Sequence, residues 1–284
     1  MNTLSSSVNK LPAVLRLAIL FAPLILLVLA WVSSFVQTDN LIFSVDQVYL
    51  FSFLETKWLY SYLHIFTFVP VFCLSFDRRV AFYKNWKSLF PAITVVAVFF
   101  IIWDVLFTQM GVWGFNPDYI SGISFFYLPF EEILFFFTVP FACTFIYECL
   151  NYYFPKDYLA SIEPYLTPIL ILIFLSIGTI YYTNLYTTTT FLLSGFVLLC
   201  HCFYGEAAFR KRFYLAYLVS WIPFMLVNGA LTGSYTNAPV VVYNPAEYLG
   251  VRLTSVPLDD SIYSFAMLFS VMWLYERLKS AKHK

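Results

Sequence analysis

Charged residues are scarce in this chain. Asp, Glu, Lys and Arg make up 11% of its 284 residues, whereas 61% are hydrophobic. A soluble domain carries about 25% charged residues. So small a polar fraction cannot cover a globule in water, and the outer surface of the folded chain must therefore face lipid.

Several functional motifs are missing as well. The formal net charge is zero, so nothing indicates a nucleic acid or an acidic partner. The nine glycines form neither GxGxxG nor a P-loop. There is no HExxH, no Asp-rich diphosphate motif, and no Lys in the last apolar run that could hold retinal. The five cysteines lie in apolar runs without metal-ligand spacing, as packed core residues do. We therefore expect no metal and no cofactor.

Hydrophobic residues instead form eight runs of the length that crosses a bilayer, which is about 20 helical residues. They lie near 12–36, 57–76, 89–109, 129–152, 165–184, 188–207, 213–233 and 258–278. The first run is longer than the apolar part of a signal peptide, so we interpret it as a span. The predicted fold is an all-α, polytopic integral membrane helical bundle of about eight spanning helices.

Basic residues predict the orientation of these spans. With the N-terminus in the cytoplasm, 14 of the 16 Lys and Arg residues fall on the cytoplasmic side. Lys57 and Arg252 fall outside. This asymmetry follows the positive-inside rule. It predicts a multi-pass protein of the cell membrane with both termini in the cytoplasm.

The sequence also contains an internal repeat. A first set of residues recurs 128 positions later: Asn116-Pro117, Gly122, Pro129 and Glu131-Glu132 correspond to Asn244-Pro245, Gly250, Pro257 and Asp259-Asp260. Asp104 with Thr108 corresponds to Asn228 with Thr232 when the second loop is allowed four more residues. We expect residues 1–154 and 155–284 to form two repeats of four spans, which makes the repeats parallel.

The two acid pairs allow two interpretations. Pro followed by acidic residues is a favourable helix start, because the helix dipole stabilises negative charge there. However, Glu131-Glu132 stands inside a long apolar and aromatic run. Carboxyl groups in such surroundings usually face a bundle interior and mark function. Neighbouring helical residues point about 100° apart, so one acid of each pair can face a cavity while the other supports it.

Other polar residues within the runs are open to more than one explanation. Asp104 and Asn228 are either hydrogen-bonding contacts between helices or cavity residues. Glu148 and Glu276 lie 16 residues beyond the acid pairs, about 24 Å along a helix, where interfacial anchoring is expected. His64 and His201 stand alone in apolar surroundings and are treated as packed or interfacial.

Several motifs together resemble one enzyme family. They are Trp113-Gly-Phe-Asn-Pro, Gly122, Leu128-Pro-Phe-Glu-Glu-Ile-Leu, Asn228-Gly-Ala-Leu-Thr-Gly and Val256-Pro-Leu-Asp-Asp. They look like the membrane-embedded lycopene cyclases of actinobacterial, archaeal and fungal type, here in a fused single-chain form. The resemblance covers residues 45 to 280. Asp259-Asp260 departs from it, since Glu-Asp is expected there.

This resemblance implies a function. Glu131, Glu132, Asp259 and Asp260 would be catalytic, and Asp104, Asn228, Asn116 and Asn244 would contact substrate. An internal acid would protonate an acyclic carotenoid in the bilayer, and cyclisation would give a β-type end group without a redox change or a cofactor. Other enzymes of the carotenoid pathway are candidate partners.

Two alternatives come from other classes of protein. A proton-coupled transporter would also have repeats and intramembrane acids, although transporter sites usually lie near mid-membrane. A non-catalytic subunit of a lipid-modifying complex is the other alternative. Expression in a lycopene-accumulating host, with chromatography of the pigments, would separate the three.

The charge asymmetry generates a first testable prediction. Reporter fusions after residues 85, 157 and 211 should lie in the cytoplasm, whereas fusions near 118 and 245 should lie outside. An opposite location at either 118 or 245 would disprove that the two acid pairs share one side.

Overall fold

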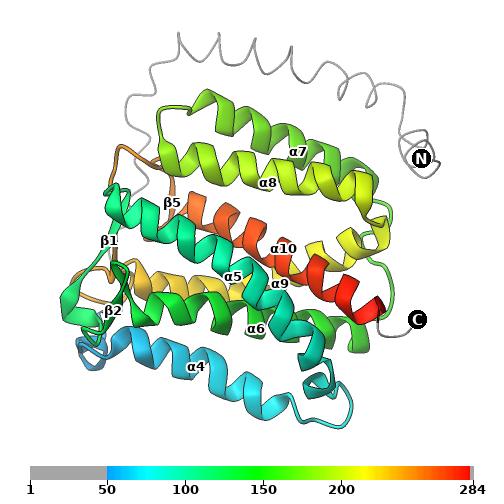
Figure 1. Cartoon of the computed structure of the whole chain (residues 1–284), viewed down its shortest axis with the longest axis horizontal. Coiled ribbons are helices and arrows are strands. Elements are labelled where there is room, and N and C mark those ends of the chain that lie inside the picture. Colours follow the sequence, from blue (N-terminus) through cyan, green and yellow to red (C-terminus); the bar gives the residue numbers. More distant parts are fainter. Residues whose placement is uncertain (1–49, 282–284) are drawn as a thin grey trace.

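The structure, a computed structural model, describes residues 50–281. In this range seven helices form one bundle (Figure 1). They are α4 (Leu59–Leu74), α5 (Trp86–Gln109), α6 (Phe130–Tyr153), α7 (Glu163–Ile180), α8 (Leu185–Tyr204), α9 (Ala207–Leu231) and α10 (Leu258–Ala281). Three single-turn 3₁₀ helices, η1 (Ser52–Leu54), η2 (Phe82–Asn85) and η3 (Pro117–Tyr119), lie in the connections. The predicted all-α bundle is confirmed.

The number of spans is a separate question. Five helical segments are long and apolar enough to cross a membrane: Phe82–Gln109, Phe130–Tyr153, Glu163–Ile180, Leu185–Tyr204 and Ala207–Leu231. α4 is apolar but shorter. α10 is the least apolar of the seven helices, and more than half of its residues are buried, because it packs against α5, α6, α8 and α9. The predicted span at 12–36 lies outside the described residues, so the count of eight is not confirmed.

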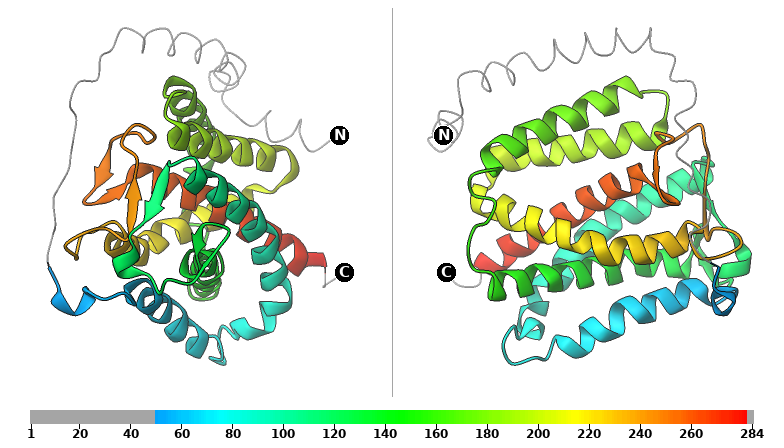
Figure 2. Two further views of the ribbon diagram at one scale, coloured as in Figure 1. Left: turned by 60° about the vertical axis from the view of Figure 1, so that its left-hand side comes forward. Right: turned by 180° about the vertical axis from the view of Figure 1, so that it is seen from behind.

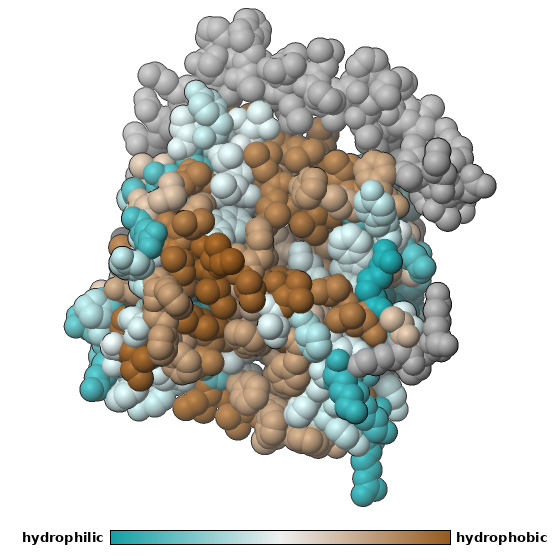
Figure 3. Space-filling model, in the orientation of Figure 1, coloured by the Kyte–Doolittle hydropathy of each residue, from teal (hydrophilic) through white to brown (hydrophobic). Residues whose placement is uncertain are grey.

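The surface matches a lipid environment. Large apolar side chains such as Val95, Ile222 and Leu218 are well exposed on the outside of the helices. Hydrophobic residues cover much of the middle of the face shown in Figure 3, whereas hydrophilic residues gather toward its two ends. Such a distribution is expected of a membrane protein, whose outer surface is as apolar as its interior.

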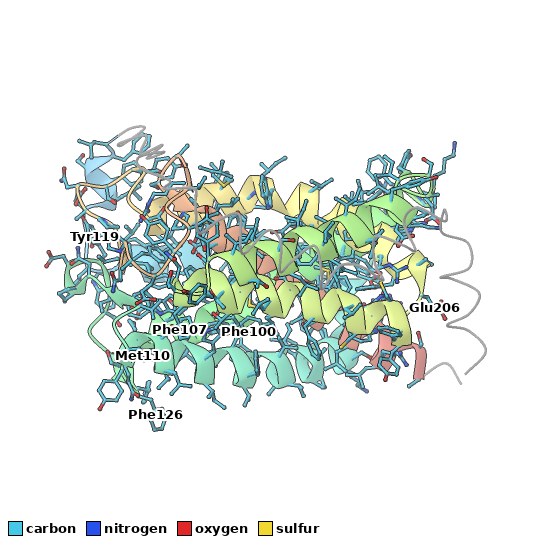
Figure 4. All side chains as sticks on the ribbon, turned by 90° about the horizontal axis from the view of Figure 1, so that it is seen from above. Phe100, Phe107, Met110, Tyr119, Phe126 and Glu206 are labelled. Carbon is cyan, nitrogen blue, oxygen red and sulfur yellow. The ribbon has the colours of Figure 1, made fainter. Side chains whose placement is uncertain are left out.

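The two ends of the bundle differ. α4, α6, α8 and α10 all begin at the end that carries the strands (Figure 1). Met110, Tyr119 and Phe126 lie at this end, and Glu206 lies at the other (Figure 4). The opposite end contains the ion pairs Arg210–Glu163 at 2.6 Å, Arg212–Asp157 at 2.9 Å and Lys279–Glu148 at 2.6 Å. The helices of the two repeats therefore run in the same direction.

A short antiparallel ribbon joins the two repeats at the strand-bearing end. β1 (Trp113–Phe115) pairs with β4 (Val241–Tyr243), and Gly114 lies opposite Val242, 128 positions later. The flanking bonds are equivalent too: Asn116 N donates to Val240 O at 2.8 Å, and Asn244 N donates to Val112 O at 2.9 Å. An antiparallel pair whose central residues are repeat equivalents lies on a two-fold axis. The ribbon therefore marks the pseudo-symmetry axis of the molecule.

Two hairpins lead into the acid-bearing helices. β2 (Ser124–Phe125) pairs with β3 (Leu128–Pro129) before α6, and β5 (Arg252–Leu253) pairs with β6 (Val256–Pro257) before α10. Pro129 is the N-cap of α6. The hairpins place Glu131-Glu132 and Asp259-Asp260 in the first turns of the two helices.

The contact between α7 and α8 generates a stability prediction. A Cβ added at Gly178 would lie 2.8 Å from Leu192 Cγ and 3.0 Å from the Leu192 main-chain N, whereas one added at Gly114 would meet nothing within 4 Å. Gly178→Val should therefore lower the free energy of unfolding by about 1–3 kcal/mol, the usual cost of overpacking. Gly114→Val should cost less, as thermal unfolding in detergent would show. Equal losses would contradict this packing.

Candidate active site

The first acid of each pair links its helix, α6 or α10, to α4 or α8 and to the loop that precedes the acid. Glu131 Oε1 accepts hydrogen bonds of 2.9 Å from Ser61 Oγ and from Ser121 N. Asp259 Oδ1 accepts one of 2.5 Å from Thr187 Oγ1, and its Oδ2 accepts one of 3.2 Å from Leu249 N. Both carboxyl groups are buried. The two sets of contacts are the same in kind, a hydroxyl from α4 or α8 and a loop amide.

The second acid of each pair accepts a hydrogen bond from a tyrosine. Tyr60 OH of α4 donates to Glu132 Oε2 at 2.7 Å. Tyr186 OH of α8 donates to Asp260 Oδ1, also at 2.7 Å. These tyrosines immediately precede Ser61 and Thr187, so two successive residues of one helix bond two successive acids of another. The first turns of α6 and α10 are held in this way.

The second acids, Glu132 and Asp260, meet at one cavity of about 50 Å³. Glu132 and Asp260 line it together with Asp104 of α5 and Asn228 of α9. A volume of this size holds a few water molecules. The repeats therefore contribute to a single composite cavity beside the two-fold axis, instead of each forming a cavity of its own.

Asp104 and Asn228 occupy equivalent places but make different contacts. Asn228 Nδ2 donates to Asp260 Oδ2 at 2.7 Å. Asp104 Oδ1 instead accepts a bond of 2.5 Å from Trp113 Nε1, and its Oδ2 has no hydrogen-bond partner among the described residues. The two halves of the cavity are thus chemically different, with an extra carboxyl group on the side of Glu132.

Asp260 has the most donors of the cavity acids. Besides Tyr186 and Asn228, Tyr243 OH of β4 donates to its Oδ2 at 2.8 Å. Burial and the negative charge of Asp260 hold the pKa of Tyr243 well above its usual value, so this phenol keeps its proton. Three donors on one carboxyl group stabilise its ionised form.

Aromatic rings form most of the remaining wall. Trp113 contacts Tyr186 edge to face at 4.9 Å between ring centroids, and Tyr186 stacks on Tyr243 at 6.1 Å. Tyr263 of α10 lies 6.1 Å from Tyr186, and its hydroxyl has no partner in the described part of the chain. Unpartnered buried hydroxyls are uncommon. Together with Asp104 Oδ2, this one makes the cavity suitable for a ligand or ordered water.

The two remaining predicted contact residues lie elsewhere. Asn116 Oδ1 accepts a bond of 3.0 Å from Asp118 N at the start of η3, and Asn244 Oδ1 accepts one of 3.1 Å from Ala246 N. Neither side chain lines the cavity. Both residues stabilise loop turns next to the ribbon, which explains their recurrence in structural terms.

Glu148 lies at the other end of α6, where Tyr275 OH donates to it at 2.7 Å and Lys279 at 2.6 Å. His64 bonds Thr138 Oγ1 at 2.9 Å and the Glu131 main-chain O at 2.8 Å. Both residues are thus part of helix packing. Among residues 50–281, no three His, Cys, Asp or Glu side chains are grouped so as to hold a metal ion.

The tyrosines around the cavity were not predicted from the sequence. The chain has 22 tyrosines, so composition gives no reason to select Tyr60, Tyr186, Tyr243 or Tyr263. A weak signal was present in the pairs Tyr60-Ser61 and Tyr186-Thr187, which recur 126 positions apart. Only the packing of α4 on α6, and of α8 on α10, shows that these residues donate hydrogen bonds to the acids.

The fold and cavity define a helical membrane protein whose two repeats share one site rich in carboxyl groups. A family model described as "Lycopene cyclase" matches residues 56–150 and 183–278, more than half of the chain. No curated protein and no solved structure matches the chain. The chain belongs to the lycopene cyclase family, and is thereby a membrane-bound carotenoid cyclase whose substrate is a lipophilic carotenoid.

The two matched regions agree with the repeat. Each contains three helices, α4–α6 in the first and α8–α10 in the second. The internal repeat predicted from the sequence is therefore confirmed, and α7 lies between the matched regions.

The cavity geometry generates a prediction for the acids. Glu132→Gln and Asp260→Asn keep the side-chain volume but remove the titratable group, so cyclisation should fall by about 10²–10⁴-fold, the usual contribution of a general acid or base. Glu148→Gln, at the far end of α6, is the matched control and should remain close to the parent chain. Product formation would be measured by chromatography with lycopene in lipid. Normal activity in both cavity variants would show that the acid pairs are only favourable helix starts.

Proposed function

We propose that this protein cyclises the end groups of an acyclic carotenoid such as lycopene to β-type rings, by a proton-initiated reaction without a redox change. The observation that carries this proposal is the convergence of Asp104, Glu132 and Asp260 on one aromatic-lined cavity. An acid and a base are both needed, and the cavity offers three carboxyl groups in different surroundings.

The reaction begins with proton transfer from a carboxyl group to the terminal double bond of the substrate. One O–H bond breaks, one C–H bond forms, and a tertiary cation results. The π electrons of the next double bond then form the new C–C bond that closes the six-membered ring. Loss of a proton from the ring carbon at that bond completes the β-type end group. One proton enters and one leaves, so atoms and electrons balance.

The contacts of the acids support a division of roles. Glu132 has one side-chain donor, Tyr60, and shares the cavity with Asp104, whose Oδ2 is free of protein partners in the described range. These two carboxyl groups are the proposed proton source. Asp260, with three donors, is the proposed carboxylate that balances the cation and accepts the departing proton. Glu131 and Asp259 are proposed to act through helix positioning.

The aromatic wall supports the same chemistry. Faces of Trp and Tyr attract cations, by about 2 kcal/mol or more when the contact is desolvated. Trp113, Tyr186 and Tyr263 surround the cavity. They can stabilise the passing carbocation while they exclude bulk water that would quench it.

The distribution of basic residues supports a proposed orientation of the protein in the membrane. We propose that residues 1–154 and 155–284 are the two repeats, that both termini lie in the cytoplasm, and that the strand-bearing end with the cavity faces away from it. The ion pairs of Arg210, Arg212 and Lys279 at the opposite end support this orientation.

Heavy water tests the proton-initiated mechanism. The donating carboxyl exchanges with solvent between turnovers, so product formed in heavy water should gain one deuterium per ring, in the ring methylene next to the gem-dimethyl carbon. Mass spectrometry would count the label and NMR would locate it. Product made in ordinary water and then transferred to heavy water is the control. Unlabelled product, or a strict requirement for reduced flavin, would refute the mechanism.

A further inference from the structure

A second hollow lies on the side of the bundle formed by α4, α6 and α9. It has a volume of about 360 Å³, and its walls are mostly apolar side chains such as Phe66, Val139 and Val227. α4 and α9 each pack against α6 but have little contact with each other. The view from behind shows the three helices next to one another (right view of Figure 2). We call this hollow the α4–α9 groove.

The groove adjoins the acid cavity. Four residues line both spaces: Phe135, Phe224, Asn228 and Ser264. Two of them, Asn228 and Ser264, are polar. The other two are the phenylalanine rings of α6 and α9, which are partly buried. Both rings therefore lie where the groove and the cavity adjoin.

The groove is long and runs along the helices. On α6 its lining extends from Phe135 to Ile146, and on α9 from Tyr217 to Asn228. Each interval is 11 residues, or about 16 Å of helix. An elongated, apolar space of this length fits a stretched hydrocarbon chain, with one end of the chain at the cavity.

The other side of the pseudo-symmetric bundle is closely packed at three of the equivalent positions. The counterparts of Tyr217, Trp221 and Phe224 are Ile93, Ala97 and Phe100, each at most 1% exposed. Phe100 also packs edge to face on Tyr263 with 5.0 Å between ring centroids. Close packing of α5 on α10 therefore fills the space that stays open between α4 and α9.

Prolines support this difference. Pro70 of α4 and Pro223 of α9 lie within their helices and line the two walls of the groove. Their repeat counterparts, Phe196 and Phe99, are exposed to the surroundings instead. Proline removes a main-chain hydrogen bond and allows a helix to bend. Among the equivalent helices α5, α8 and α10, only α5 contains a proline, Pro91, so proline is more frequent on the side of the groove.

We propose that the α4–α9 groove binds the polyene chain of the carotenoid and delivers its end group past Phe135 and Phe224 to the acid cavity. This inference rests on the proposed cyclisation for the identity of the ligand. Both ends of a symmetric carotenoid then enter by the same side, one after the other, and the second end requires the chain to leave and turn round.

A pair of adjacent residues on α9 provides the test. Val227 lines the groove, whereas Leu226 is 53% exposed and lies outside it. Val227→Trp fills the groove, so kcat/KM for lycopene should fall roughly tenfold or more, because displaced substrate reacts poorly. Leu226→Trp adds the same bulk to the lipid side and should stay within about twofold of the parent. Val139→Trp on α6 repeats the test if Val227→Trp folds poorly in thermal unfolding.

Binding is measured separately from chemistry. Free lycopene is achiral, and it acquires circular dichroism in its visible band only in a chiral site. The Glu132→Gln protein in lipid nanodiscs should give this signal, Val227→Trp added to it should abolish the signal, and Leu226→Trp should keep it. If the parent protein does not cyclise lycopene, but Val227→Trp still abolishes the circular-dichroism signal, the groove is supported and the proposed function is refuted. If the Val227→Trp protein binds and cyclises lycopene like the parent, binding in the groove is refuted and the proposed function is unaffected.

Discussion

A carboxyl group inside a lipid-embedded bundle is tolerated only when donors compensate for its lost water. The first turns of α6 and α10 each contain two such groups, and the start of the neighbouring helix supplies a donor to both. Tyr60 and Ser61 do so for Glu132 and Glu131. These bonds fix the rotation and height of α6 on α4, and their repeat equivalents do the same for α10 on α8. Apolar packing alone would leave helices free to slide, because lipid and helix surfaces are equally apolar.

The same bonds explain why the site is shared between the repeats. With Glu131 and Asp259 turned toward their supporting helices, the next residues point toward the two-fold axis. Glu132 and Asp260 therefore reach the same cavity from opposite sides. The β1–β4 ribbon closes the cavity at the strand-bearing end, where Trp113 and Tyr243 contribute side chains from paired positions. The two sides of the cavity differ in their ionisable groups because the two repeats differ in sequence, above all at Asp104 and Asn228.

Much of the fold could be predicted from the sequence. The seven apolar runs within the described residues correspond to α4–α10 with small shifts, because hydropathy and length identify membrane helices well. The recurrence of Glu131-Glu132 as Asp259-Asp260 also identified the helix starts that face the cavity. Those signals are local in sequence, or repeat at a constant spacing.

The features of the structure that could not be predicted depend on which faces of the helices pack together. Hydropathy does not show which face of an apolar helix meets another helix, so the role of Tyr60 and Tyr186 and the open side between α4 and α9 stayed hidden. Asn116 and Asn244 recur as strictly as the acids, yet they stabilise turns outside the cavity. Recurrence identifies constrained positions without separating a turn from a site.

The paired ribbon and shared cavity have a consequence for how such a chain can change over generations. Duplicated sequences usually provide redundancy, since one copy can preserve the old role while the other drifts. Here each copy holds half of one cavity, and the central pairing of Gly114 with Val242 exists only between copies. Damage to either half is therefore not buffered by the other. What duplication provided instead was freedom for equivalent positions to specialise in opposite ways, with an acid on one side of the axis and an amide on the other.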